Sequence, residues 1–311
     1  MNTALYSPQA CRLHDMGRGH PECPERLDAI LDHLRATGLD ALLEHREAPP
    51  AHAEQLARAH SARYVAEMRE LMHGCAQAGR AQAVDPDTTV SPHTQEAALR
   101  AAGAAVAATD AVLAGEVRNA FCAVRPPGHH AEESSAMGFC VYGNVALAAL
   151  EALAHPGIER VAILDFDVHH GNGTVDICRG RPEVLVCSSF QHPFYPGRLH
   201  DLVQPNIVNT PLPEGSDGSA FRRAIDATWA EAIARHRPQF VFVSAGFDAH
   251  RDDPLGGLAL DESDFTWITR RICDWADSWA GGRIVSMLEG GYDLQALARS
   301  TVAHVDVLLG R

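Results

Sequence analysis

The chain has 311 residues, enough for one large α/β domain or two ordinary ones, and enough to bury a core without disulfides. Its formal net charge of -14 argues against nucleic acid as a partner, because the phosphate backbone would be repelled, and favours cationic substrates such as a lysine-rich tail or a polyamine. The eight cysteines form no CxxC pair, and the first residues lack the basic and apolar segments of a secretory signal. No apolar run approaches the roughly 18 residues of a membrane span. We therefore expect a reduced, cytoplasmic protein with no membrane segment.

The N-terminal third is expected to form one short strand followed by loops and helices. Residues 3–6 are apolar, and residues 14–26 form a polar loop rich in histidine, glycine and proline, a composition that suits a functional surface loop. We expect His14 and His20 to lie in this loop or at the rim of a site rather than to bind metal. Helical patterns follow, one opening at Pro24 and stopped by Gly38, and others over 51–60, 61–79 and 94–115.

From residue 119 onward, apolar runs alternate with helical patterns. This alternation is typical of βαβ units and predicts an α/β protein with a doubly wound, mostly parallel sheet. No break is rich enough in proline and glycine to be a domain boundary, so we expect a single domain over residues 1–311. The expected strands are 120–124, 160–166, 184–190, 239–244 and 283–288, and the expected helices are 142–154, 218–236, 261–279 and 293–309.

Polar side chains follow four of the expected strands. The central strand ends in Asp165, Asp167 and His169, which would lean the same way if the extended geometry continued. Taken alone, this stretch could be a helix cap with a hydrogen-bonded turn. Similar polar stretches follow the other three strands, and parallel strands place their carboxyl ends at one edge of the sheet. The four together therefore indicate a functional site: RPPGHH at 125–130, DFDVHH at 165–170, SAGFDAH at 244–250 and EGGYD at 289–293.

The residue types at these strand ends suit a metal-assisted reaction. A catalytic zinc ion usually has three protein ligands and one open position. Asp167 and His169 supply two ligands, and Asp248 is the natural third from a neighbouring strand end. Two carboxylates would leave the ion nearly neutral, so a separate general base would help, and the adjacent imidazoles of His129 and His130 suit that role.

Three further residues have roles that the same chemistry suggests. The hydroxyl of Tyr292, which follows two glycines, could donate to a developing oxyanion. Asp165 would orient a histidine or bind a structural cation, and Asn172 would orient the other histidine. There is no GxSxG motif, and neither GxGxxG nor a Walker lysine is present, so a serine nucleophile and a nucleotide fold are excluded.

Taken together, these motifs resemble the zinc-dependent histone deacetylase family, especially its class II-like bacterial amidohydrolase branch. The resemblance runs from about residue 5 to residue 305 and implies a three-layer α/β fold of the arginase/deacetylase type. The loop GHPECPERL at 19–27 and DPLGG at 253–257 fit the family as well. The five main motifs, in the family's order, are RPPGHH (125–130), GFCVYGN (138–144), DFDVHHGNGT (165–174), SAGFDAH (244–250) and LEGGYD (288–293).

The resemblance implies a role for each of these groups. One zinc ion per chain would be held by Asp167, His169 and Asp248. Tyr292 would polarise the acyl carbonyl, and His130 would be the general base. The remaining assignments are His129 as electrostatic partner or acid, Asp165 as its support, and Asn172 as the neutral partner of His130.

The resemblance also implies a substrate channel and a second cation. Gly138 and Phe139 would form one wall of the acyl-lysine channel and Tyr195 the other, while Leu255 would occupy the gatekeeper position. Acetylpolyamine-selective relatives can carry an acidic residue at that position, so Leu255 favours acyl-lysine in protein or peptide. Monovalent-cation sites in the family make Asp165 and Ser188 candidate potassium ligands.

The sequence leaves two other interpretations open and argues against a third. An acetylpolyamine amidohydrolase would use the same chemistry with a narrower mouth. A non-catalytic acyl-lysine-binding protein would need neither Tyr292 nor the histidine pair. An arginase-like enzyme would need a second metal, but Gly171 and His250 stand where that site requires aspartates. The number of subunits also stays open, a homo-oligomer included.

Overall fold

An eight-stranded sheet forms the centre of the protein in the computed structural model, which describes residues 2–311. Its strands, in chain order, are β1 (Thr3–Tyr6), β2 (Glu44–Arg46), β5 (Asn119–Cys122), β6 (Val161–Asp165), β7 (Val184–Gln191), β8 (Ile207–Leu212), β9 (Phe240–Ala245) and β10 (Ile284–Leu288). The spatial order is β2-β1-β5-β10-β9-β6-β7-β8, and every pairing within it is parallel. A small antiparallel pair, β3 (Gln82–Ala83) with β4 (Thr89–Val90), lies apart.

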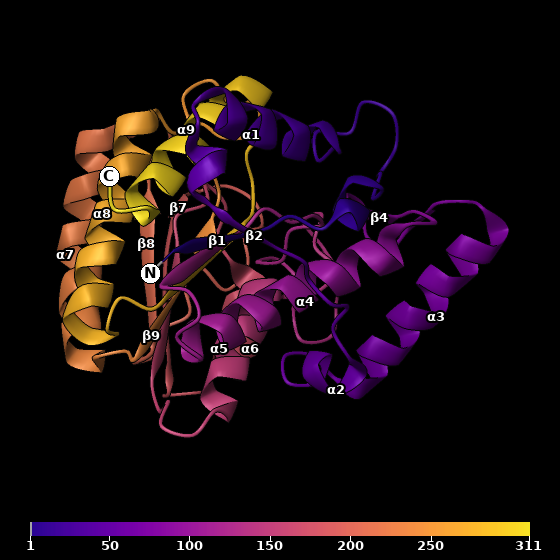
Figure 1. Ribbon diagram of the computed structural model, residues 1–311, viewed down its shortest axis with the longest axis horizontal. Coiled ribbons are helices and arrows are strands. Elements are labelled where there is room, and N and C mark those ends of the chain that lie inside the picture. The colour runs from indigo at the N-terminus through magenta and orange to yellow at the C-terminus, as the bar shows by residue number, and fades with distance from the viewer. Residues whose placement is uncertain (1) are drawn as a thin grey trace.

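Helices cover both faces of this sheet, which gives three layers. Figure 1 shows α7, α8 and α9 on one side and α4, α5 and α6 on the other, while α3 extends away from the body. No helix among residues 2–311 is long and apolar enough to cross a membrane. The α-helices are α1 (Glu25–Ala36), α2 (Ala53–Leu56), α3 (Ala62–Ala78), α4 (Thr94–Leu113), α5 (Asn144–Ala154), α6 (Asn172–Cys178), α7 (Gly218–His236), α8 (Glu262–Trp279) and α9 (Leu294–Leu308), with 3-10 turns η1 (Gln9–Arg12) and η2 (Leu39–Leu42).

The two helical layers explain why the central strands are continuously apolar. Strand β6 reads Val-Ala-Ile-Leu-Asp, and all five of its residues are buried. A strand that is covered on one face only would alternate apolar and polar residues, whereas a strand covered on both faces cannot. The one charged residue, Asp165, stands at the carboxyl end, where the strand leaves the core.

The strand order brings four chain segments to one edge of the sheet. Strands β5, β10, β9 and β6 are the middle four, and their carboxyl ends are nearly level: Asp165 pairs with Ser244, and Leu288 with Ala245. On one side of this group the chain runs outward from β1 to β2, and on the other side it runs outward from β6 through β7 to β8. Doubly wound sheets form their binding sites where the strand order reverses in this way. The loops after these strands therefore meet, as the sequence predicted.

The expected three-layer, parallel α/β fold is confirmed, with differences at the periphery. Helix α7 has the predicted bounds, α3 is shorter by one residue at each end, and α8 begins one residue later than predicted. The helix expected over 51–60 is wrong: only Ala53–Leu56 is α-helical. Strands β2 and β8 were not predicted, because β2 reads Glu-His-Arg and β8 contains Pro211, and both lie at sheet edges where such residues are tolerated.

Three buried histidines outside the strand-end cluster are held in the neutral form. Burial lowers the pKa of His14 and His60 to about 4 and that of His304 to about 3. The two ring nitrogens of His304 lie 2.7 Å from Thr269 Oγ1 and 2.9 Å from Ser286 Oγ. Unfolding restores the ordinary pKa of about 6.5. The stability from these groups is therefore complete above pH 6.5 and is lost as the pH falls towards the folded pKa values.

We expect His304→Gln to flatten the acid dependence of stability. Wild type takes up one more proton at this residue on unfolding below pH 6.5, so the slope of unfolding free energy against pH should fall by about 1.4 kcal/mol per pH unit in the variant. Urea unfolding at pH values from 7 to 4.5 measures this slope. His73→Asn, at an exposed position in α3, is the matched control and should leave it unchanged. An unaltered slope in His304→Gln would contradict the assignment.

Candidate active site

Asp167, His169 and Asp248 converge at the sheet edge. His169 Nδ1 lies 3.1 Å from Asp167 Oδ1 and 3.2 Å from Asp248 Oδ2, and the three side chains are buried. One donor atom from each residue lies within 4.8 Å of the other two. The arrangement thus presents two carboxylate oxygens and one imidazole nitrogen to a single point.

Backbone hydrogen bonds fix the direction of each carboxylate. The chain turns after β6 instead of staying extended, because the N–H of Asp167 donates to Asp165 Oδ1 (3.1 Å) and that of His169 to Asp167 Oδ1 (2.9 Å). The N–H of Gly290 donates to Asp167 Oδ2 (2.8 Å), and that of Val168 to Asp248 Oδ1 (2.9 Å). These donors leave Asp167 Oδ1 and Asp248 Oδ2 turned towards the imidazole. The extended geometry therefore ends at Asp165, and the side chains of Asp167 and His169 are brought together by the turn.

The electrostatics of this cluster favour a cation. Burial and the neighbouring Asp167 raise the pKa of Asp248 to about 7. Burial alone would lower the pKa of His169, but its hydrogen bonds to Asp167 and Asp248 raise it to about 10. Two buried carboxylates thus stabilise positive charge at the point they share. Oxygen and nitrogen donors in this number suit a divalent ion such as zinc, so the residues fit a metal.

Two glycines allow the backbone to approach this cluster. A Cβ at Gly290 would overlap Asp248 Oδ2 and lie 2.7 Å from Asp167 Oδ2. A Cβ at Gly246 would likewise overlap Asp167 Oδ2. The space for the metal-facing carboxylates therefore depends on the absence of a side chain at both positions.

Two adjacent imidazoles lie beside the cluster, and the pKa of one is raised while that of the other is lowered. His129 Nδ1 lies 3.1 Å from Asp165 Oδ2, and His130 Nδ1 lies 2.7 Å from Asn172 Oδ1, as the sequence predicted. Burial would lower the pKa of His129, but the carboxylates of Asp167 and Asp165 outweigh it and hold the pKa well above its usual value. Burial, reinforced by His129 and His169, lowers the pKa of His130 well below its usual value. The two environments thus favour the neutral form of His130 and the protonated form of His129.

Glu289 anchors the histidine pair, a role that the sequence did not predict. Its Oε2 accepts the N–H groups of Gly128 (2.7 Å) and His129 (3.1 Å), and Ser244 Oγ donates to its Oε1 (3.2 Å). The side chain is fully buried, and burial raises its pKa to about 7. A glutamate directly after the apolar strand β10 was the available signal, but its partners lie in a distant loop.

Tyr292 is held from two sides. Its backbone N–H donates to Asp253 Oδ2 (2.6 Å), and the guanidinium carbon of Arg26 lies 5.0 Å from the centre of its ring. Arg26 also donates to the carbonyl oxygens of Glu289 (2.5 Å) and Gly291 (2.6 Å). Burial and the nearby Asp248 raise the pKa of Tyr292 well above its usual value, so the hydroxyl keeps its proton and can donate it in a hydrogen bond.

A cavity of about 290 Å³ leads to this site. Phe139 and Tyr292 meet edge to face at 5.8 Å, and Phe194 stacks on the ring of His169 at 5.4 Å. The sequence predicted the lining residues Gly138, Phe139, Tyr195 and Leu255 but not Asp87, Phe194 and Pro254. All seven line the cavity, together with His130, His169 and Tyr292.

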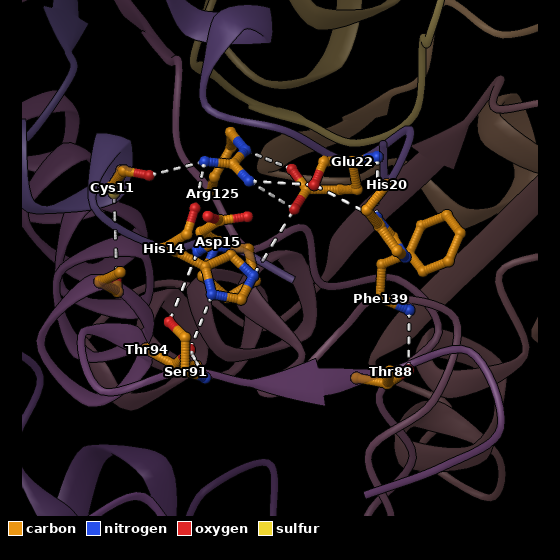
Figure 2. Close-up of polar contacts among 12 residues, drawn as sticks. Cys11, His14, Asp15, His20, Glu22, Thr88, Ser91, Thr94, Arg125 and Phe139 are labelled. Atoms are coloured by element: carbon orange, nitrogen blue, oxygen red, sulfur yellow. Dashed lines mark hydrogen bonds and ion pairs between the residues drawn. The ribbon is translucent and has the colours of Figure 1, made fainter. Parts of the chain in front are cut away.

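The polar N-terminal loop is anchored by a buried ion pair, shown in Figure 2. Arg125 donates to both carboxylate oxygens of Glu22, and it also donates to the carbonyl oxygens of Cys11 (2.9 Å) and His14 (3.0 Å). Burial would raise the pKa of Glu22, but the neighbouring cationic groups, above all Arg125, lower it to about 2. His14 lies at the start of this loop, as expected, but it is fully buried and not at a rim.

The same loop reaches the cavity wall through His20. The ring of His20 contacts that of Phe139 at 4.8 Å, and the N–H of Phe139 donates to Thr88 Oγ1 (3.0 Å), as Figure 2 also shows. The two candidate potassium ligands, Asp165 and Ser188, pair across β6 and β7 and are both buried. His250 is buried but contacts Glu262 rather than the metal cluster.

The eight-stranded parallel sheet with helices on both faces is an α/β fold of the arginase/deacetylase type, and comparison with known proteins gives the family. A family model described as "Histone deacetylase domain" matches residues 20–308. The crystal structure of the HDA15 HD domain aligns with a TM-score of 0.92 and 33% identity, covering 100% of this chain and 88% of that one. The chain belongs to the histone deacetylase family, whose members are metal-dependent, and is a hydrolase.

Two relatives illustrate the range of the family. The histone deacetylase-like amidohydrolase of Pseudomonas aeruginosa is 40% identical over 302 residues, which cover 94% of this chain and 77% of that protein. The polyamine deacetylase HDAC10 of Mus musculus is 38% identical over 308 residues, covering 93% of this chain and 45% of that protein. The relatives thus include an enzyme named for polyamines.

We expect Gly290→Ala to lose bound divalent metal. The added methyl group would overlap Asp248 Oδ2 and displace the carboxylates from their common point. Metal content of the purified protein, measured by mass spectrometry, should fall from about one ion per chain to well below half. Gly74→Ala is the control, because a Cβ there meets nothing within 4 Å. Full metal content in Gly290→Ala would rule out this cluster as the binding site.

Proposed function

We propose that the protein hydrolyses the amide of N-acetyl-lysine, or another N-acyl-lysine, in proteins or peptides, releasing acetate and a free amine. The observation that carries this proposal is the convergence of Asp167, His169 and Asp248 beside the imidazoles of His129 and His130 at the end of a largely apolar cavity. We also propose that residues 1–311 form a single deacetylase domain.

The metal in this proposal is one zinc ion per chain, held by Asp167, His169 and Asp248. Such an ion, when bound, acts as a Lewis acid towards the acyl carbonyl and the attacking water. Asp165 and Ser188 are proposed as ligands of a structural potassium ion, because they are paired residues of β6 and β7 and both are buried.

The protein's own groups account for the proton transfers. His130, whose pKa is lowered, takes the proton from the attacking water. Tyr292, whose pKa is raised, keeps its proton and donates a hydrogen bond to the oxyanion that forms from the acyl carbonyl. His129, charged beside Asp165, stabilises the developing negative charge, and a histidine of the pair then protonates the leaving amine. A protein that only bound acyl-lysine would need none of these groups.

Two features of the cavity bear on the choice of substrate. Leu255 lies in its lining and offers an apolar contact, which suits the methylene chain of an acyl-lysine in peptide. Asp87 also lines the cavity and is an acidic group near the path of a cationic substrate. The second observation, with the polyamine deacetylase among the relatives, supports an acetylpolyamine amidohydrolase as the alternative.

We expect zinc-loaded wild type to turn over an acetyl-lysine peptide faster than N-acetylputrescine. Removal of the metal by a chelator should abolish both activities. Tyr292→Phe should lower kcat by about a hundredfold or more, because the oxyanion loses its donor. Parallel assays of both substrates with wild type and variant test this. Faster turnover of N-acetylputrescine would favour the alternative, and turnover of neither would refute the proposed reaction.

We also expect Leu255→Glu to shift the preference towards the polyamine. A carboxylate at the mouth attracts the free ammonium groups of an acetylpolyamine, and about 1 kcal/mol of such pairing corresponds to about a fivefold change. The ratio of kcat/KM for N-acetylputrescine to that for a neutral acetyl-lysine peptide should rise by about this factor. Leu255→Gln, similar in size but uncharged, should leave the ratio near that of wild type; an equal rise in both variants would exclude the electrostatic explanation.

A further inference from the structure

A chain of hydrogen bonds continues beyond His130 and Asn172 to a buried carboxylate. Asn172 Oδ1 lies 2.7 Å from His130 Nδ1, and Asn172 Nδ2 donates to Glu132 Oε1 at 2.8 Å. The other oxygen of Glu132, Oε2, accepts from Arg198 Nη2 at 3.0 Å and from Ser135 Oγ at 3.2 Å. Glu132 is 6% exposed and Asn172 is fully buried, so water cannot readily replace the bond between them, whereas the side chain of Arg198 is exposed.

The chemistry of these partners determines which residue can stand at position 132. Arg198 and Asn172 Nδ2 are both donors, and they meet the two ends of the same side chain. Only a carboxylate accepts at both ends, because an amide presents one acceptor and one donor. The two donors and the single carboxylate therefore match as a set.

The carboxylate in turn fixes the orientation of the Asn172 amide. An ionised carboxylate has no proton to give, so the amide must turn its Nδ2 towards Glu132 and its Oδ1 towards His130. An oxygen facing His130 Nδ1 requires that this nitrogen carry the proton. The unprotonated nitrogen of His130 is then Nε2, which is the atom that can accept a proton.

We propose that Glu132 is a positioning residue for His130, which acts through Asn172 to hold the imidazole in the tautomer with a free Nε2. This inference rests on the proposed role of His130 as general base. Glu132 has no place in the lining of the cavity and touches neither the substrate path nor the metal cluster. Its contribution is the orientation of the amide next to the base.

Glu132→Gln should lower kcat by about tenfold to a hundredfold with little change in KM. The new amide faces two donors with one acceptor, so either Arg198 or Asn172 meets an N–H group. When Asn172 reverses to avoid this, its Nδ2 faces His130 Nδ1 and favours the tautomer with the proton on Nε2, which cannot act as base. Losses of this size are typical of partners that orient a group in a metal site.

The decisive test exchanges the two side-chain types, so that the carboxylate stands at position 172 and the amide at position 132. In the double variant N172D/E132Q, the carboxylate at 172 accepts from His130 Nδ1, while the amide at 132 donates to that carboxylate and keeps its oxygen for Arg198. The bonds to His130 and Arg198 keep their direction, and the bond between positions 172 and 132 is restored with donor and acceptor exchanged. We expect kcat to recover to within about threefold of wild type, whereas N172D alone, with two carboxylates in contact, should stay impaired. A structural requirement for glutamate at 132 could not produce this recovery.

Two further variants test whether a loss of kcat in Glu132→Gln comes from the lost charge alone or from the contact with the loop that carries Tyr195. Glu133→Gln changes an exposed carboxylate on the next residue and should behave as wild type. Arg198→Gln removes the outer partner of Glu132, whose guanidinium stands in the loop that carries Tyr195, and should keep kcat within about threefold of wild type. If Arg198→Gln instead reproduced the loss seen in Glu132→Gln, the carboxylate would serve the loop and the proposal would fail.

Failure of this inference is distinguishable from failure of the proposed function. Absence of turnover by zinc-loaded wild type would refute the deacetylase proposal itself. Normal turnover by wild type and by Glu132→Gln, or no recovery in N172D/E132Q despite wild-type metal content and cooperative unfolding, would overturn the role of Glu132 alone. Metal content and thermal unfolding of each variant are therefore measured alongside the kinetics.

Discussion

The structure depends on the burial of four carboxylates at one edge of the sheet: those of Asp165, Asp167, Asp248 and Glu289. Water does not screen these charges, so the protein must supply donors or cations to each. Asp167, Asp248 and Glu289 take backbone N–H groups from neighbouring loops, and Asp165 takes an imidazole as well. The loop conformations at this edge follow from that requirement, as does the affinity of the remaining oxygens for a positive ion.

A second buried network joins the beginning of the chain to its end. Glu22 pairs with Arg125, which follows β5, and with Arg26, which opens α1 and donates to the carbonyl groups on either side of Gly290. The polar N-terminal loop is therefore part of the support of Tyr292 and not a free surface loop. Breaking a buried pair of this kind typically costs about 3–5 kcal/mol, because it leaves an uncompensated charge.

The sequence predicted the layers of the fold and the residues that gather at the strand ends, since both follow from local patterns: apolar runs in strands, and polar residues directly after them. It did not predict β2 and β8, whose polar or proline-containing sequences are tolerated only because they lie at sheet edges. Nor did it identify Glu289, Glu132 or Asp253 as supports. A carboxylate in a loop has no local signal that names a distant partner, and these partners are defined by tertiary packing alone.

Asp253 gives the site a property that matters for its evolution and redesign. One carboxylate accepts the N–H of Leu255, at the cavity mouth, and those of Tyr292 and Asp293, in the last loop of the site. The cavity mouth and the loop that carries Tyr292 are thus both held by the carboxylate of Asp253. Residues 254 and 255 can change in shape and charge around this carboxylate, whereas Gly256 must stay, because a Cβ there would overlap the carbonyl oxygen of Asp248. Selectivity can therefore diversify at these two positions while the chemistry is preserved. A library built to change the substrate range of this scaffold should randomise the mouth and keep Asp253.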